Sequence, residues 1–138
     1  MTPHPKKKHR RSKPSGKMPS HLDLIRQLPC ILSGRPAEVA HIRYADGRYC
    51  KPETGIGIKP HDRWTLPLCP ELHRLVDGCQ HSTNEREWWK SFGLDPRLIA
   101  SKLWGKNRTM MERVIAQHTP IKPAIVARIR DILEGAVK

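Results

Sequence analysis

A chain of 138 residues with 37% hydrophobic and 5% aromatic residues can form one small domain with a modest core. It has no run of about 18 apolar residues and no apolar stretch behind its basic N-terminus, so we expect neither a membrane span nor a secretory signal. The net charge of +13 indicates a polyanionic partner, above all nucleic acid, with a merely solubilising charge as the alternative. We expect a cytoplasmic protein.

The excess positive charge is concentrated at the N-terminus. Seven lysine and arginine residues lie in positions 1–17, which hold no acid, and the rest of the chain has 19 basic and 13 acidic residues. Several prolines interrupt this segment, and its composition cannot bury a core. We predict a disordered basic arm over residues 1–19. Its candidate nucleic-acid-binding residues are Lys6, Lys7, Lys8, Arg10 and Arg11.

The ordered part is expected to begin at Ser20, which can cap a helix over residues 21–28. Residues 30–32 and 38–42 are short apolar runs bounded by turn residues and predict two strands. Residues 43–63 are rich in glycine and proline and predict a long loop, a feature that is often functional.

A third short strand is expected at residues 65–68, followed by a helix over residues 70–76 that Pro70 begins. Helical signals dominate afterwards, with a last helix over residues 123–133. Three further helix starts are expected at Ser82-x-x-Glu85, Asp95-Pro96 and Thr109-x-x-Glu112. The pattern predicts an α+β domain over residues 20–105. The C-terminal helices of residues 106–138 would pack on it or mediate self-association.

Trp88 and Trp89 lie together on one of these expected helices. Adjacent helical residues point about 100° apart, so we expect at most one of the two in the centre of the core. Stacking on a nucleic-acid base and burial are the two interpretations of the other side chain.

The histidines carry most of the chemistry that the sequence offers. Hydrolysis of a phosphodiester needs a base for water, a cation for the developing charge, and groups that hold the backbone. His41 ends an expected strand and His73 lies on the helix after a later strand, while Asp62 and His81 flank these elements. A purely structural role is the alternative. Basic residues beside them are phosphate-binding candidates: Arg43, Lys59, Arg63 and Arg74.

Residues 21–104 resemble the HNH (ββα-metal) endonuclease superfamily, most closely a phage- and prophage-encoded branch related to a RecA-dependent recombination-enhancing nuclease. The resemblance rests on the order and spacing of short motifs. They are Leu28-Pro29-Cys30, Ala40-His41-Ile42-Arg43, Gly55-Ile56-Gly57-Ile58-Lys59-Pro60, Asp62-Arg63-Trp64, Pro67-Leu68-Cys69, His73-Arg74, Gln80-His81-Ser82, Asn84-Glu85-Arg86-Glu87-Trp88-Trp89 and Gly93-Leu94-Asp95-Pro96.

The resemblance implies a small ββα-metal core and a role for each site residue. His41 is the implied general base, His73 a ligand of a catalytic divalent cation, and His81 a second ligand. Asp62 is implied either to brace the loop or to bind the metal. The implied cofactor is Mg²⁺ or Mn²⁺, with Zn²⁺ or Ni²⁺ as alternatives. The implied substrate is DNA, cut to a 3′-hydroxyl and a 5′-phosphate. A RecA-type recombinase filament in a bacterial host is the implied partner.

The sequence departs from the family pattern at two places. Many members hold a structural zinc with paired ligands, but Ser33 and Leu72 stand where Cys30 and Cys69 would have their partners. Two thiolates make a poor tetrahedral site, so we expect the structural zinc to be lost, with substitution by Cys50 or Cys79 as the alternative.

The second departure is Ala40, which stands where many members have a metal ligand directly before the base. It raises an alternative function, a DNA-binding recombination-accessory protein with the same fold and little or no cleavage. An RNA-binding module with structural His and Cys residues is a third interpretation.

Overall fold

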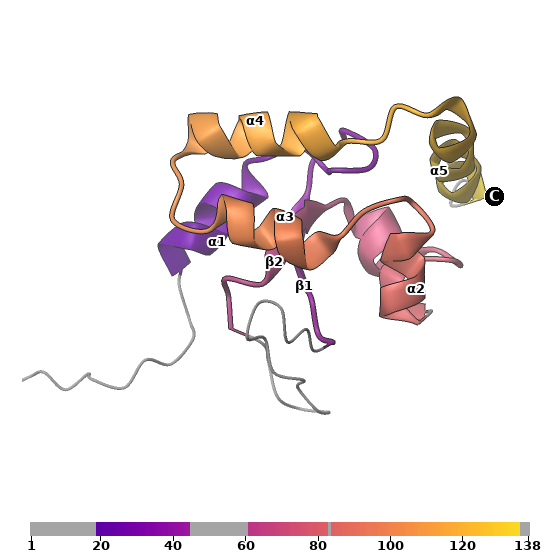
Figure 1. The fold of residues 1–138 in the computed structure, drawn as a ribbon. Helices are drawn as coiled ribbons and strands as arrows, with labels where there is room; N and C mark the ends of the chain where they lie inside the picture. The colour runs from indigo at the N-terminus through magenta and orange to yellow at the C-terminus, as the bar shows by residue number, and fades with distance from the viewer. Residues whose placement is uncertain (1–18, 45–60, 83, 136–138) are drawn as a thin grey trace, which may run out of the picture.

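The computed structural model describes residues 19–44, 61–82 and 84–135 (Figure 1). Predictions for the arm and for most of the long loop lie outside these residues. The predicted site residues concerned are Lys6, Lys7, Lys8, Arg10, Arg11, Cys50 and Lys59. Among the described helices, none has the length and apolar character needed to cross a bilayer.

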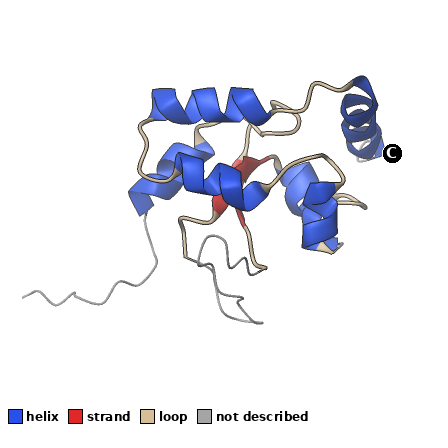
Figure 2. Cartoon of the chain, in the orientation of Figure 1, coloured by secondary structure: helices blue, strands red, loops and turns tan. Residues whose placement is uncertain are grey.

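A short antiparallel sheet lies among the helices (Figure 2). Within the described residues it consists of β1 (Glu38–His41) and β2 (Thr65–Leu68), with His41 paired to Thr65. The prediction of these two strands is confirmed, and β1 ends one residue earlier than expected. All four residues of β2 are buried, so this strand lies inside the core, whereas β1 is only partly buried. Helices and strands together confirm an α+β protein.

The strand predicted at residues 30–32 is wrong. These residues form a turn in which the Gly34 N–H donates to the Cys30 carbonyl at 2.9 Å, with Gly34 at φ +77°. Both backbone groups of Cys30 are bonded within this turn, because its N–H donates to the Arg35 carbonyl at 2.8 Å. The Ile31 N–H nevertheless donates to the Pro67 carbonyl at 3.1 Å, which holds the turn against β2.

The helix predicted at residues 70–76 is shorter and wider than expected. It forms η3 (Glu71–Leu75), a π-helical turn in which the Val76 N–H donates to the Glu71 carbonyl, five residues earlier, at 3.2 Å. π-Turns are rare and are often found at functional sites. η3 presents His73 and Arg74. A 3₁₀ turn that the sequence pattern did not predict, η4 (Gln80–Ser82), follows it.

The remaining helices agree with the predicted number and order of helical segments in the described chain. Their bounds are α1 (Pro19–Arg26), α2 (Glu85–Lys90), α3 (Pro96–Leu103), α4 (Arg108–His118) and α5 (Pro123–Gly135). The first helix thus begins and ends earlier than the predicted residues 21–28.

Two of the three predicted helix starts need correction. Asp95 caps α3 as expected, with its carboxylate accepting a backbone N–H at 3.3 Å. Asn84 caps α2 and Asn107 caps α4, with amide oxygens that accept backbone N–H groups at 3.1 and 2.9 Å. The capping boxes proposed at Ser82 and Thr109 are therefore wrong, because an asparagine is a strong cap and lies next to each first turn.

The core joins the sheet to helices from both halves of the chain. Trp88 and Trp89 are both buried, so the expectation that at most one would be central is wrong. α4 and α5 contribute to the same core. Their buried side chains are Met111, Ile115, Ile129 and Leu133. These four side chains pack in the core, whereas Met110 and Val126 of the same helices are exposed, and self-association of the C-terminal helices stays a prediction.

Candidate functional site

His41 and Asp62 meet at the end of the sheet. His41 is the last residue of β1, and Asp62 lies three residues before β2. The Nε2 atom of His41 is 2.8 Å from Oδ1 of Asp62, whose exposure is only 3%. The Asp62 carbonyl also accepts the Thr65 hydroxyl at 2.9 Å, which fixes this turn to β2. A buried carboxylate at this position orients the imidazole and stabilises its protonated form.

His73 and His81 form a second pair beside it. Their ring centroids are 4.4 Å apart with an interplanar angle of 71°. His73 comes from η3 and is buried, whereas His81 comes from η4 and is exposed. The turns that follow the sheet thus bring together the two histidines that the sequence predicts as metal ligands.

Glu38 is a site residue that the sequence reasoning missed. Its Oε2 atom is 2.5 Å from Nδ1 of His73, and it accepts the Arg74 Nε–H at 2.8 Å. A second Arg74 donor, Nη2, reaches Oε1 at 3.1 Å. The available signal was the position of Glu38, an acid at the start of the strand that ends in His41.

Burial and neighbouring charges set the protonation of these groups. Burial lowers the pKa of His73 below its usual value of 6.5, although Glu38 acts in the opposite direction. Burial, and then the nearby His73, also lower the pKa of His81. Hydrogen bonding to Arg74, followed by that to His73, lowers the pKa of Glu38. Near neutral pH both imidazoles are therefore uncharged, the form that binds a metal ion.

A hollow of about 370 Å³ connects the two pairs. It is lined by His41, Arg43, Gln80, His81 and Glu85. The Glu85 carboxylate accepts the Arg43 backbone N–H at 3.2 Å and the Gln80 amide at 3.1 Å, which ties α2 to the strand end. Gln80 and Glu85 are further lining residues that the sequence reasoning did not select as site residues.

The donor set for a metal ion consists of the two imidazoles. Among the described residues, no group of three or more His, Cys, Asp and Glu side chains is arranged to hold a metal ion. Imidazole nitrogen suits Mn²⁺, Ni²⁺ and Zn²⁺, whereas Mg²⁺ prefers oxygen ligands. His73 and His81 are therefore the residues that would hold a cation of the first kind.

The predicted phosphate-binding arginines have three different surroundings. The Arg43 side chain is exposed beside the hollow. Arg74 is bound to Glu38. Arg63 lies with its guanidinium carbon 4.9 Å from the Trp64 ring centroid and 5.5 Å from that of Trp104, a packing position.

Cys30 and Cys69 are buried next to each other. The Ser33 hydroxyl donates to the Cys69 sulfur and the Ser33 N–H to the Cys30 sulfur, both at 3.4 Å. The interaction between the two thiols lowers the pKa of Cys30 and raises that of Cys69. Ser33 thus contacts both sulfurs at the position where the HNH resemblance would place a zinc ligand. The loss of zinc stays a prediction that elemental analysis tests; one zinc per chain would contradict it.

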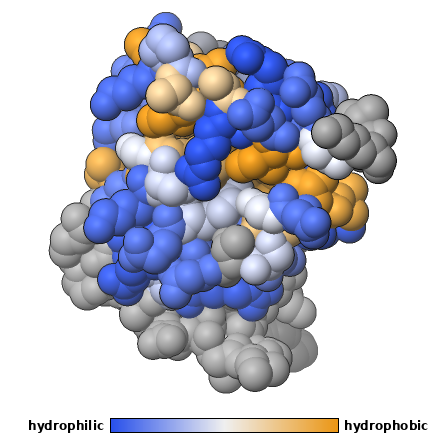
Figure 3. Space-filling model, turned by 90° about the vertical axis from the view of Figure 1, so that its right-hand side faces the viewer, coloured by the Kyte–Doolittle hydropathy of each residue, from blue (hydrophilic) through white to orange (hydrophobic). Residues whose placement is uncertain are grey.

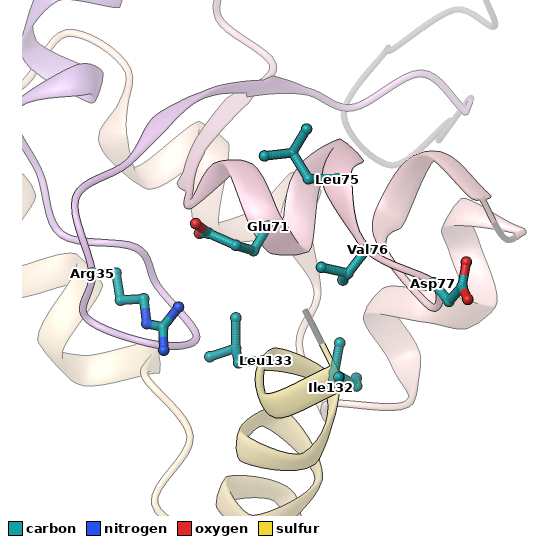
Figure 4. A pocket seen from close by; sticks show the side chains of 8 residues that line it. Arg35, Glu71, Leu75, Val76, Asp77, Ile132 and Leu133 are labelled. Carbon is teal, nitrogen blue, oxygen red and sulfur yellow. The ribbon is translucent and has the colours of Figure 1, made fainter. Parts of the chain in front are cut away.

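A larger hollow of about 560 Å³ lies between η3 and α5 (Figure 4). Its lining includes Arg35, Glu71, Leu75 and Leu133 and none of the residues predicted for the site. The face that carries α2 and α5 is mostly hydrophilic, with hydrophobic areas between (Figure 3). Leu75, with 59% of its surface exposed, is one of the chain's exposed hydrophobic residues.

The sequence of the chain matches the model of one protein family. A family model described as "Protein of unknown function (DUF968)" matches residues 4–109, which include every residue of the two histidine pairs. No curated protein and no solved structure matches the chain.

Proposed function

The chain belongs to the DUF968 family of proteins of unknown function, and we propose that it is a metal-dependent endonuclease of the HNH type that hydrolyses phosphodiester bonds in DNA. The observation that supports this proposal most is the juxtaposition of two histidine pairs. His41 with Asp62 resembles a base and its orienting acid, and His73 with His81 resembles a metal-binding pair. The two pairs are close enough for His41 to lower the pKa of His73.

In the proposed reaction, His41 takes a proton from a water molecule at Nδ1, on the side of the ring away from Asp62. Asp62 holds the opposite nitrogen and stabilises the imidazolium that forms. The water oxygen bonds to phosphorus and the bond to the 3′-oxygen breaks. The products are a 5′-phosphate and a 3′-hydroxyl, whose proton comes from solvent.

A bound divalent cation would supply charge stabilisation for the phosphoryl and leaving oxygens. His73 and His81 would hold this cation. Arg43, at the edge of the hollow, would hold a neighbouring phosphate by charge. Phosphate contacts carry no base information, so we expect low sequence specificity.

Plasmid nicking tests the proposal. The wild type is compared with His41→Ala and His73→Ala in Mn²⁺, Ni²⁺, Zn²⁺ or Mg²⁺, and with a chelator. His118→Ala is the matched control, because His118 lies on α4 and contacts Lys102 instead of the site. We expect both site variants to lose activity and the control to keep it. Equal nicking by all four proteins would exclude the mechanism.

The chemical groups left on the DNA at each nick provide a second test. Nicks with a 3′-hydroxyl and a 5′-phosphate are substrates for DNA ligase, so ligase should reseal them. A RecA-type filament on single-stranded DNA is the further substrate to compare, since the resemblance implies such a partner.

A second candidate function is a DNA-binding accessory role without cleavage. Ala40 favours it, because this fully buried residue directly before His41 has no side chain that could bind a metal ion. Gel-shift binding that persists with a chelator, together with no nicking in any metal, would support this candidate over the nuclease.

A further inference from the structure

We propose that Glu38 is a positioning residue that fixes the tautomer and orientation of His73, so that His73 presents its Nε2 atom to a divalent cation. This inference rests on the proposed function, because it explains how one of the two proposed metal ligands is prepared. It adds a residue that the family resemblance did not indicate.

The contact between Glu38 and His73 joins two elements that are distant in sequence. Glu38 begins β1, and His73 lies 35 residues later in the π-turn η3. The 2.5 Å separation of Oε2 and Nδ1 is a short hydrogen-bonding distance. His73 is only 8% exposed, so little of its ring is open to water.

Arg74 determines which partner donates the proton. Its Nε and Nη2 atoms donate to the two oxygens of Glu38, a bidentate pairing that holds the carboxylate ionised and in one orientation. An ionised carboxylate only accepts hydrogen bonds, so Nδ1 of His73 carries the hydrogen. Nε2 then has the lone pair and acts as the ligand atom.

This arrangement matches a general requirement of histidine ligands. A metal-binding imidazole usually donates its other N–H to a carboxylate or a carbonyl, which sets the tautomer and raises the basicity of the ligand atom. Glu38 meets that requirement from the strand that also carries His41. The start of β1 therefore supports the metal ligand, and its end carries the base.

The test compares full-length Glu38→Ala and Glu38→Gln with the wild type. Glu71→Gln is the matched control, because Glu71 lies on the same π-turn but faces the hollow shown in Figure 4. The tautomer is read from nitrogen–proton correlation spectra of ¹⁵N-histidine-labelled protein without metal. Affinity for Mn²⁺ and Zn²⁺ is measured by calorimetry. Thermal unfolding checks that each variant is folded.

In the wild type and in Glu71→Gln we expect His73 to carry its hydrogen on Nδ1. In Glu38→Ala we expect a shift toward the Nε2–H form and a metal dissociation constant raised about 10- to 100-fold. Glu38→Gln keeps an acceptor oxygen and should lie between them. If Glu38→Ala fails to fold, this second variant decides.

Two results would overturn the inference: an Nε2–H tautomer in the wild type, or unchanged metal affinity in folded Glu38 variants. Failure of the nuclease proposal looks different. A wild type that binds metal with the expected tautomer but never nicks DNA removes the catalytic proposal and leaves the role of Glu38 intact.

Discussion

Asp62→Asn is the substitution that tests the proposed chemistry most directly. It preserves the shape of the side chain and removes its charge at a site where only 3% of the residue is exposed. The interaction that weakens is the one between Oδ1 and Nε2 of His41 at 2.8 Å, because an amide oxygen can still accept this hydrogen bond but carries no charge. A hydrogen bond to a charged group contributes about 1.5–3 kcal/mol. Because His41 would gain its charge during the proposed reaction, we expect this energy to be lost mainly in the transition state.

At about 1.4 kcal/mol for each factor of ten, the cleavage rate should fall about 10- to 150-fold. The assay measures nicking rates over a range of metal concentrations, with thermal unfolding as the check on folding. Asp23→Asn is the matched control, since it removes the same charge from an exposed residue of α1. We expect a lower maximal rate for Asp62→Asn and an unchanged metal concentration at half-maximal rate.

This design also decides between the two roles that the sequence left open for Asp62. If raising the metal concentration restores the rate of Asp62→Asn, then Asp62 is a metal ligand and the reasoning from the His41 contact is wrong. If Asp62→Asn nicks DNA as fast as Asp23→Asn, the contact has no catalytic role.

Three further predictions concern stability and DNA binding. Trp88→Phe should destabilise the protein by about 1–3 kcal/mol more than Trp89→Phe in urea denaturation. The reason is that the Trp88 indole donates to the Gly78 carbonyl at 2.6 Å, while the buried Trp89 indole N–H has no acceptor among the described residues. An equal loss of stability in the two variants would contradict this prediction. Burial lowers the pKa of His21 below 6.5, so the unfolded chain binds protons more readily as the pH falls through that value. Stability should therefore decrease from pH 7.5 to 5.5, and His21→Phe should flatten this decrease; an unaltered pH profile of thermal unfolding would refute the assignment. Deleting residues 1–17 removes seven cationic side chains and should reduce the salt dependence of DNA binding, and an unchanged slope would show that the arm does not bind.

The parts of the fold that could be predicted depend on local patterns. β2 was predicted at its observed bounds because a short apolar run between turn residues has few alternatives. The helix starts at Asn84 and Asn107 were misplaced because several capping residues lie close together in the sequence. Both tryptophans of α2 are buried because this short helix is covered on more than one side, which periodicity cannot indicate.

Most residues of the candidate site could be predicted from their type and place in the sequence, but their contacts with one another could not. His41, Asp62, His73 and His81 were selected from their places around the expected strands, and the structure brings them together as two pairs. Glu38 was missed because its contact with His73 spans 35 residues and depends on the wide turn of η3. Arg63 was selected for its charge, although its guanidinium packs on tryptophan rings.

The contact between His41 and Asp62 has a consequence for how related proteins can diverge. These two residues are 21 positions apart, and the pairing of β1 with β2 fixes both ends of the intervening segment. Doubling the length of a closed segment costs only about 0.6 kcal/mol. Insertions and deletions within positions 45–60 should therefore be inexpensive and leave the contact between His41 and Asp62 in place. We expect this segment to vary in length among homologues more than any other part of the domain, while the His41–Asp62 pair is retained.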